Sequence, residues 1–445
     1  SMGGFVLAMA IITTYTSASS FVGGPGVAYN VGLGWILLSM IQVPTAFLTL
    51  GVLGKRFALI ARRTNAVTIT DFIRARYGSD LVVILASLSL LVFFMASMLA
   101  QFIGGARLFE SVTGYSYQTG LLIFGLTVVI YTTVGGFRAV VLTDTIQGVM
   151  MLFASLAILY AVITAGGGVE SIMQTLYSID PQLLTPTGGG NAIPKPFILS
   201  FWVLVGIGIL GLPQTTQKCL GYKDSRSMHN AMIIGTFVVG FTMLAMHLVG
   251  AMGRAVIPDI TVGDLAVPTL TVRLMSPFWA GIFIAGPLAA IMSTVDSMLI
   301  MCSAAIVKEL YFHYIVKNDE SRLSPKKVRG MSLVVTAVVG VLVFFAAMKP
   351  PSLLVWINLF AFGGLEAVFF CPTLFGLYWK RANSTGAILS MICGAAAFFW
   401  FNITKTSIAG TTAIVPTLVI AIAAFVAGSL LGRPESEEKL KVFEI

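Results

Sequence analysis

Charge is scarce in this chain of 445 residues, of which only 10% are charged and 57% are hydrophobic. A soluble globular domain carries about 25% charged residues. This composition excludes an ordinary soluble enzyme or binding domain. We expect an all-α polytopic membrane protein whose main partner is the lipid bilayer.

Cysteine and histidine are also few, with four and three residues in the chain. The cysteines lie in or beside apolar runs without paired spacing, so we expect buried thiols instead of a disulfide framework. The histidines are scattered, which argues against a zinc site. These residues are Cys219, Cys302, Cys371, Cys393, His229, His247 and His313.

Two further features are missing from the sequence. No charged segment precedes the first apolar run, so we expect no cleavable signal peptide. No basic patch interleaves with aromatic residues, so the net charge of +9 does not indicate nucleic-acid binding. Basic cytoplasmic loops explain that charge instead.

Long apolar runs are abundant, and each is about 20 residues long, enough to cross a bilayer as a helix. Amphipathic pieces near 68–77 and 263–275 look like surface or re-entrant helices instead of spans. We expect twelve spans, at about 4–29, 32–54, 80–108, 116–134, 139–166, 197–216, 228–252, 278–307, 328–347, 353–378, 385–403 and 412–432.

The loops between these spans differ in charge. Lysine and arginine gather in 55–76, 218–226, 317–329, 380–381 and 433–441. By the positive-inside rule, these loops are cytoplasmic. With twelve spans, both Ser1 and Ile445 are then expected in the cytoplasm.

Two of the expected spans contain breaks. The first includes "TTYTSASSFVGGPGVAY", and the sixth includes "GIGILGLPQTTQKCL". Five spans separate the two breaks, so the second group starts from the opposite side of the membrane. This is an inverted repeat, as in many secondary transporters. We expect repeats at 1–166 and 197–378, with two added helices and a cytoplasmic tail in 379–445.

Hydroxyl groups fill the first break, from Thr13 to Ser20. They can bond to their own helix carbonyls and weaken the helical ladder. A break at membrane depth is tolerated where it lines a cavity or is buried in protein. Its free carbonyls could then bind a cation, and its N–H groups a carboxylate. The alternative is that these small residues only allow close helix packing.

A second polar cluster lies in "AGPLAAIMSTVDSMLIMCSA", where Ala290, Ser293, Thr294 and Ser297 share one helical face. Oxygen ligands at this spacing suit a hard monovalent cation. Intramembrane carboxylates are functional candidates by default, and this chain has Asp144, Asp296 and Glu366. As alternatives, Asp144 caps a helix or pairs with Arg138, Asp296 bonds to a neighbouring helix, and Glu366 has a packing or gating role.

Four motifs together resemble signatures of the sodium:solute symporter family, in the same order and across essentially the whole chain. They are "TSASSFVGGPG", "GGFRAVVLTDTIQ", "AAIMSTVDS" and "GLYWKRANSTGA". Within the family, "SFWVLVGIGILGLP" and "KPPSLLVWINLFAFGGLEAVFFCP" are most similar to the bacterial sodium/pantothenate symporters. The resemblance implies a five-plus-five inverted-repeat bundle with discontinuous first and sixth spans. It also implies a further span before the first one found here.

The resemblance also implies site residues. A sodium ion would be held by carbonyls of Thr13, Thr16 and Ala290 and by hydroxyls of Ser293 and Thr294. A second sodium, known in some relatives, would lie near Asp144, Ser293, Asp296 and Ser297. Those relatives have a hydroxyl where this chain has Asp296. Expected substrate-binding residues are Ser17, Ser19, Ser20, Gln42 and Gln101.

These observations predict a sodium-coupled symporter of the bacterial inner membrane that imports a small organic anion, with pantothenate as the substrate that the resemblance implies. Proline, sugar, sialate and short-chain acid carriers share the scaffold and remain alternatives. A channel would need a repeated selectivity element, and an enzyme would need a clustered nucleophile and base. The sequence shows neither, and it does not indicate an oligomeric state.

Overall fold

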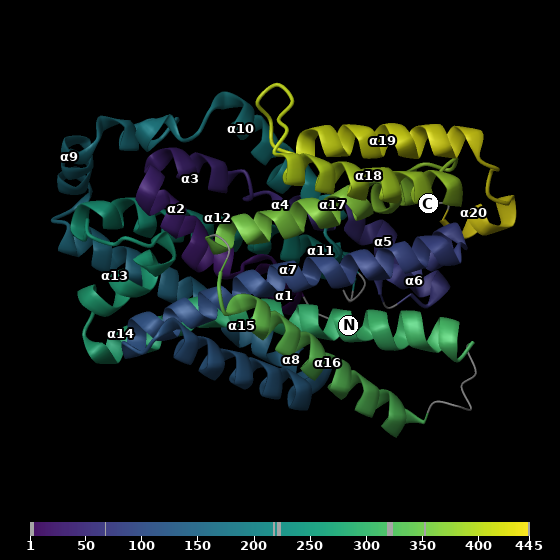
Figure 1. The fold of residues 1–445 in the computed structure, drawn as a ribbon, viewed down its shortest axis with the longest axis horizontal. Helices are drawn as coiled ribbons and strands as arrows, with labels where there is room; N and C mark the ends of the chain where they lie inside the picture. Colours follow the sequence, from purple (N-terminus) through teal and green to yellow (C-terminus); the bar gives the residue numbers. More distant parts are fainter. Residues whose placement is uncertain are drawn as a thin grey trace.

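A computed structural model describes residues 4–66, 68–216, 219, 224–317, 324–350 and 353–443, without the side chains of 134–142 and 325. The described residues form helices and connecting loops, and the long helices run along the long axis of the molecule (Figure 1). Helices α18 and α19 pack side by side at one margin of the bundle. The architecture is therefore an elongated helical bundle.

The first half of the chain begins with a helix that ends early and continues at an angle. Its elements are α1 (Gly4–Tyr15), η1 (Ser19–Gly23), α2 (Gly24–Val31), α3 (Leu33–Met40), α4 (Thr45–Leu48), η2 (Thr49–Gly54), α5 (Lys55–Thr64), α6 (Ile69–Tyr77), α7 (Asp80–Thr113), α8 (Tyr117–Ala165) and α9 (Val169–Ile179).

The second half also begins with an interrupted helix. Its main elements are α10 (Lys195–Phe201), η5 (Trp202–Ile207), η6 (Gly208–Gly211), α11 (Pro213–Thr216), α12 (Ser225–Val256), η8 (Gly263–Leu265), α13 (Ala266–Leu274), α14 (Pro277–Phe283), α15 (Ala285–Ala304), η9 (Ala305–Ile315), α16 (Pro325–Ala347), α17 (Leu354–Tyr378), α18 (Ser384–Thr404), α19 (Ile414–Leu431) and α20 (Glu437–Phe443).

Each of the twelve expected spans coincides with a helical segment. Nine helices among the described residues are long and apolar enough to cross a membrane. A tenth span is the pair Gly4–Tyr15 and Ser19–Val31, bent by 69°. Two shorter apolar helices, Tyr117–Thr133 and Lys195–Gly211, account for the fourth and sixth spans. The amphipathic pieces are helices between spans, as expected: α6, and η8 with α13.

The fourth and fifth expected spans lie within one continuous helical assignment, α8. In a straight helix, Tyr131 and Thr143 would be about 18 Å apart along the axis. Their side-chain oxygens are instead 3.0 Å apart, within hydrogen-bond distance. The chain therefore turns back between these two residues, which is consistent with two spans.

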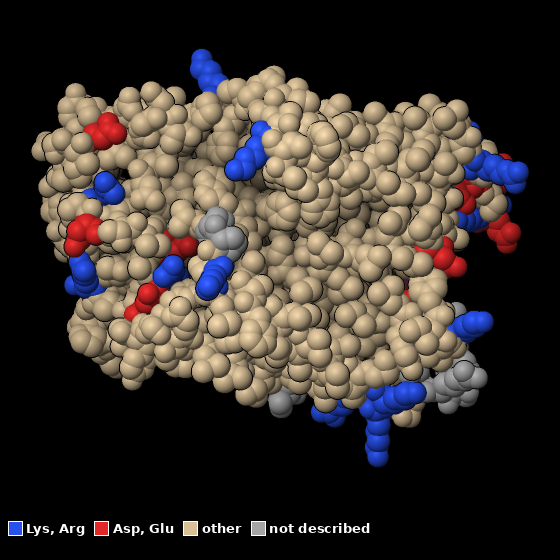
Figure 2. Space-filling view, viewed as in Figure 1, with Lys and Arg blue, Asp and Glu red and all other residues tan. Residues whose placement is uncertain are grey.

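Charged side chains on the face shown in Figure 2 gather toward the two ends of the long axis, with a mostly uncharged belt between them. We call the end that carries α6 and η9 the basic end, and the end that carries α9 and η8 the loop end. The uncharged belt is the surface expected to face lipid.

Glycine allows the first span to approach α12 closely. A Cβ atom at Gly250 would lie 2.0 Å from the Pro25 carbonyl oxygen. At Gly24, a Cβ atom would lie 2.4 Å from Nε2 of His247. Small residues at such contacts let membrane helices pack with their backbones almost touching. The broken first span is therefore seated against α12 by backbone contact.

We expect Gly250→Ala to lower the thermal unfolding midpoint in detergent, because the added methyl group would force apart the contact with Pro25, at a cost of about 1–3 kcal/mol. Gly281→Ala is the matched control, because a Cβ atom there would meet nothing within 4 Å. Equal unfolding midpoints for the two variants would contradict the proposed backbone contact.

Candidate functional site

The break in the first span begins where hydroxyl groups bond to the helix's own carbonyls. Thr16 Oγ1 donates to the Ile12 carbonyl at 2.6 Å, and Thr13 Oγ1 donates to the Ala10 carbonyl at 3.3 Å. Regular α-helix ends at Tyr15, and the helix resumes as the π-helical turn η1 at Ser19. The hydroxyl-rich sequence thus provides the local polar bonds that a helix end requires.

Gln101 of α7 stabilises this break. Its Oε1 accepts the Ala18 N–H at 2.8 Å, and its Nε2 donates to the Ser97 carbonyl at 3.3 Å. Gln101 is fully buried. Its side chain therefore satisfies a main-chain donor that the break leaves without a helical partner.

The expected sodium ligands of the two clusters meet in the structure. Ser293 Oγ donates to the Thr13 carbonyl at 2.9 Å, and Thr294 Oγ1 donates to the Thr16 carbonyl at 3.2 Å. The same two hydroxyls lie 3.2 and 2.9 Å from the Ala290 carbonyl. All five residues are buried. Five oxygen atoms, from α1, the break and α15, thus converge at one point, which we call the five-oxygen cluster.

The chemistry of this cluster fits a hard monovalent cation. It contains three carbonyl oxygens and two hydroxyl oxygens, without nitrogen or sulfur. Each hydroxyl now donates to carbonyls, but rotation about its C–O bond would turn a lone pair toward a bound cation. A cation bound there would replace these hydrogen bonds with contacts to the same oxygen atoms.

The second expected group of oxygens comes from α8 and α15. Asp296 Oδ1 accepts a short hydrogen bond from Thr132 Oγ1 of α8. This is the hydrogen bond to a neighbouring helix that was the alternative role for Asp296. Asp144 and Tyr131 are close enough to Asp296 to interact with it electrostatically. Asp144 is fully buried, and Ser297 is half-buried. The side chain of Arg138, the alternative partner of Asp144, lies outside the described residues.

A cavity adjoins the break. Ser17, Ser19, Ser20 and Gln42 line it, whereas Gln101 does not. Sequence reasoning missed the other lining residues, which are Tyr15, Gly24, Trp35, Ser39, Phe201, Val205, His247, Val355, Asn358, Leu359 and Phe362.

Polar groups from three other helices face this cavity. Tyr15 donates to Gln42 Oε1 at 3.0 Å. His247 Nδ1 lies 2.7 Å from the Met243 carbonyl, so Nε2 is directed toward the cavity. Asn358 Oδ1 accepts from Ser97 Oγ at 2.7 Å, which leaves its amide N–H groups for other acceptors. A histidine and an asparagine inside apolar runs were the signals that could have identified them.

Aromatic rings form the wall of the cavity toward the loop end. Trp35 lies edge-to-face against Phe201, with ring centroids 5.3 Å apart, and against Trp356, at 5.7 Å. Phe197 packs against the same rings. We call these four residues the aromatic cluster. Trp35 and Phe201 line the cavity, and Phe197 and Trp356 pack against these two rings outside it.

At the loop end, η8 lies directly on α2. A Cβ atom at Gly26 would lie 2.4 Å from the Gly263 carbonyl oxygen. Next to this contact, Asp264 accepts the Leu354 N–H at 3.2 Å, at the start of α17. Burial raises the pKa of Asp264 to about 6, while the Leu354 N–H and Arg107 oppose this shift. The pKa of the Asp264 carboxyl group is higher when the group is buried than when it is in water. Mild acidity therefore favours the buried position of Asp264 over a solvated position.

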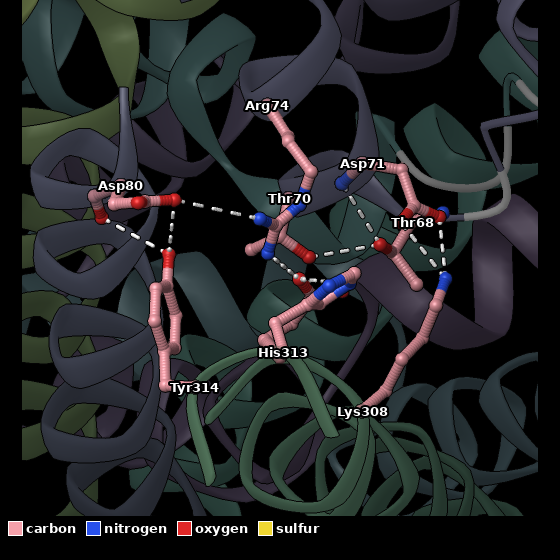
Figure 3. Close-up of polar contacts among 9 residues, drawn as sticks. Thr68, Thr70, Asp71, Arg74, Asp80, Lys308, His313 and Tyr314 are labelled. Carbon is pink, nitrogen blue, oxygen red and sulfur yellow. Dashed lines mark hydrogen bonds and ion pairs between the residues drawn. The ribbon is translucent and has the colours of Figure 1, made fainter. Parts of the chain in front are cut away.

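At the basic end, α6 is ion-paired to η9 (Figure 3). Arg74 lies 2.8 Å from Glu309, whose side chain is only 1% exposed, and Lys308 lies 2.8 Å from Asp71. Tyr314 donates to Asp80 at the start of α7. These contacts join α6, which lies between the second and third spans, to η9, which is the end of the eighth span.

The same short helix also caps α17. Arg76 of α6 is 1% exposed and donates to the carbonyls of Gly376 and Trp379, at 2.8 and 3.1 Å. A cation at a helix C-terminus satisfies unpaired carbonyls and complements the helix dipole. Helix α6 therefore connects the ends of two spans that both border the site.

The sequence profile of the sodium:solute symporter family matches residues 1–394. The chain belongs to this family. It is 52% identical to the sodium/pantothenate symporter of Escherichia coli K12, over 97% of this chain and 89% of that protein. Identity to the sodium/pantothenate symporter of Haemophilus influenzae is 50%, over 99% and 91% of the two chains. The osmoregulated proline transporter OpuE of Bacillus subtilis is 28% identical, over 100% and 90%.

Solved structures share the fold of this symporter. A Na⁺-coupled sialic acid symporter, in a substrate-bound outward-open state, matches 98% of this chain and 91% of its own with a TM-score of 0.78 at 18% identity. Mhp1, a nucleobase-cation-symport-1 family transporter, matches 100% and 96% with a TM-score of 0.59 at 15% identity.

The expected fold class is therefore confirmed, as a five-plus-five inverted-repeat bundle. The break in the sixth span falls at Leu212, whose backbone is extended between η6 and α11. Membership of the family makes the chain a sodium-coupled solute transporter and not an enzyme.

We expect Arg74→Met to loosen the basic end, because Glu309 would lose its close cation while buried, and breaking such a pair costs about 3 kcal/mol. Hydrogen–deuterium exchange should become faster in α6 and η9. Arg273→Met is the control, since its pair with Asp259 is exposed on both sides. Unchanged exchange in Arg74→Met would show that the pair with Glu309 does not hold α6 to η9.

Proposed function

We propose that this symporter imports pantothenate into bacterial cells, driven by sodium. The observation that carries the mechanism is the contact of the Ser293 and Thr294 hydroxyls with the Thr13 and Thr16 carbonyls. Identity of 50–52% to two sodium/pantothenate symporters, over nearly the whole chain, supports the substrate.

In this proposal, one sodium ion binds at the five-oxygen cluster. Its ligands are the carbonyls of Thr13, Thr16 and Ala290 with the hydroxyls of Ser293 and Thr294. The ion would hold the broken first span to α15 and fix the shape of η1, which lines the cavity. Sodium then raises the affinity for substrate, and substrate raises the affinity for sodium by the same factor.

The cavity offers complementary groups for each part of pantothenate. The carboxylate would bind at the break, where the hydroxyl groups of Ser17, Ser19 and Ser20 line the cavity near the start of a helix. Gln42 and Asn358 would bind the amide and hydroxyl groups, and the aromatic cluster would cover the dimethyl carbon. Gln101 acts as a positioning residue, since it holds the Ala18 N–H outside the cavity.

A second sodium would lie among Asp144, Ser293, Asp296 and Ser297. The closeness of Asp144 to Asp296 supports this site, because two buried carboxylates repel each other unless a cation or proton lies between them. With one sodium per monoanion, transport would be electroneutral. A second sodium would add about 2.3 kcal/mol of driving force per 100 mV of membrane potential.

We place the basic end in the cytoplasm, by the positive-inside rule, and with it both ends of the chain. The protein would lie in the bacterial inner membrane. The repeats would be 1–166 and 197–378, followed by two helices and a tail in 379–445. Alternating access would arise from rocking of one helix group against the other. In that cycle, η8 would close the outer side and α6 with η9 the inner side.

We expect Ser293→Ala and Thr294→Ala each to raise the sodium concentration for half-maximal uptake by about tenfold or more, since a bond to a charged partner contributes about 1.5–3 kcal/mol. Uptake into proteoliposomes at varied sodium measures this shift. Ser303→Ala is the control on the same helix, because Ser303 donates to the Ser332 carbonyl away from the cluster. Sodium dependence that matches the control in both variants would remove these hydroxyls from the ion site.

We expect labelled pantothenate to accumulate in a sodium-dependent, saturable way, and proline, sialate, sugars and short-chain acids not to compete. Ser20→Ala should raise the pantothenate KM at saturating sodium, because it removes a donor at the break. Ser155→Ala is the control, since this buried serine donates to Leu152 outside the cavity. Sodium-dependent uptake of one of the other solutes, with no pantothenate uptake, would overturn the proposed substrate.

A further inference from the structure

Glu366 lies in the middle of α17 and is fully buried. Neither of its carboxyl oxygens has a hydrogen-bond partner among the described residues. It does not line the cavity, although Phe362, one helical turn away, does. Neither the five-oxygen cluster nor the substrate site uses this carboxyl group.

The carboxyl group of Glu366 is pressed against the interrupted sixth span. A Cβ atom at Gly208, the first residue of η6, would lie 2.3 Å from Glu366 Oε2. One turn along each element, a Cβ atom at Gly211 would lie 2.8 Å from the Phe370 backbone. Glycine at both positions lets η6 cover the carboxyl group closely. Movement of η6 away from α17 would uncover it.

Few titratable groups face Glu366. Tyr15 of α1 is near enough to interact with it electrostatically. Glu366 is the one acidic residue of α17, which has no basic residue. The other titratable residues of this helix are Cys371 and Tyr378. Arg76 bonds to Gly376, which is ten residues and about 15 Å further along the helix. The charged residues of α7, which packs on α17, are Asp80, Arg107 and Glu110 near its two ends.

An ionised carboxylate in this position would be buried without a cation or a donor. The free-energy cost of burying an isolated carboxylate is much larger than the free energy released when a carboxyl group loses its proton at neutral pH. A carboxyl group in such a position therefore keeps its proton. A sodium ion would need several oxygen ligands, and the surface that faces Oε2 is the Gly208 backbone. A proton needs only the carboxyl oxygen itself.

We propose that Glu366 is a proton-binding site that is linked to closure of the sixth span. The carboxyl group takes a proton from water when η6 covers it, forming one O–H bond. It returns that proton to water when η6 moves away, because a hydrated carboxyl group is ionised at neutral pH. Closure of the transporter thus consumes a proton in addition to binding sodium and solute.

The direct test is infrared spectroscopy of the full chain at neutral pH, without sodium or substrate. The wild-type spectrum should contain the C=O stretch of a protonated carboxyl group, and the contribution of Glu366 should be lost in Glu366→Gln. Glu110→Gln is the control, because Glu110 is partly exposed and lies 2.7 Å from Arg107. Loss of ionised-carboxylate bands in Glu366→Gln would overturn the proposal.

The second test is function. Glu366→Gln cannot ionise, whereas wild-type closure has to draw a proton from solution, so the ratio of wild-type to Glu366→Gln sodium-driven uptake should fall as pH rises. Asp264 is present in both proteins, so its titration cancels in their ratio. Identical pH profiles would overturn the proposal.

Glu366→Met tests the proposal if Glu366→Gln does not fold. Glu366→Met replaces a neutral group without hydrogen bonds by an apolar one of similar length, so it should fold with a wild-type unfolding midpoint. If both variants fail to fold, Glu366 has an essential partner as an ionised group, and the proposal is wrong.

Discussion

The structure depends on how the polar groups of the broken first span are satisfied inside an apolar bundle. Unpaired N–H and C=O groups at membrane depth cost several kcal/mol each, so the break requires partners from other helices. Ser293 and Thr294 supply two of them, and Gln101 supplies a third. The partners come from α15 and α7, so the break orders three helices around one point. A monovalent cation would strengthen an arrangement that is already formed.

In the proposed mechanism, ion and solute would bind to the same segment of the chain. Residues at the end of α1 contribute carbonyls to the five-oxygen cluster, while the next few residues face the cavity. Coupling therefore does not need a long path through the protein. At the two ends of the bundle, η8 on α2 and the α6–η9 ion pairs hold helices that border the same segment. In the proposed cycle, a change at the break would reach both ends of the bundle through these helices.

Much of the five-oxygen cluster could be predicted from sequence, because Ser293 and Thr294 are polar residues at helical spacing within an apolar run. The break in the first span could be predicted from its hydroxyl, glycine and proline residues, and the break in the sixth span from Gly211 and Pro213. The cavity could not, since Trp35, His247 and Asn358 come from helices whose mutual packing no local pattern specifies. Gln101 was expected to contact substrate, but the structure places it at the Ala18 N–H. Only tertiary structure distinguishes these two positions for a buried glutamine.

The aromatic cluster has a consequence for the energetics of each transport cycle. Trp35 packs edge-to-face against Phe201 and Trp356, and a solute that entered the cavity between these rings would have to separate them. Exposure of apolar rings to water raises the heat capacity. The activation free energy for entry of the solute between these rings would therefore depend on temperature in a curved way. An Arrhenius plot of the transport rate would be curved even if the plots for all later steps were straight.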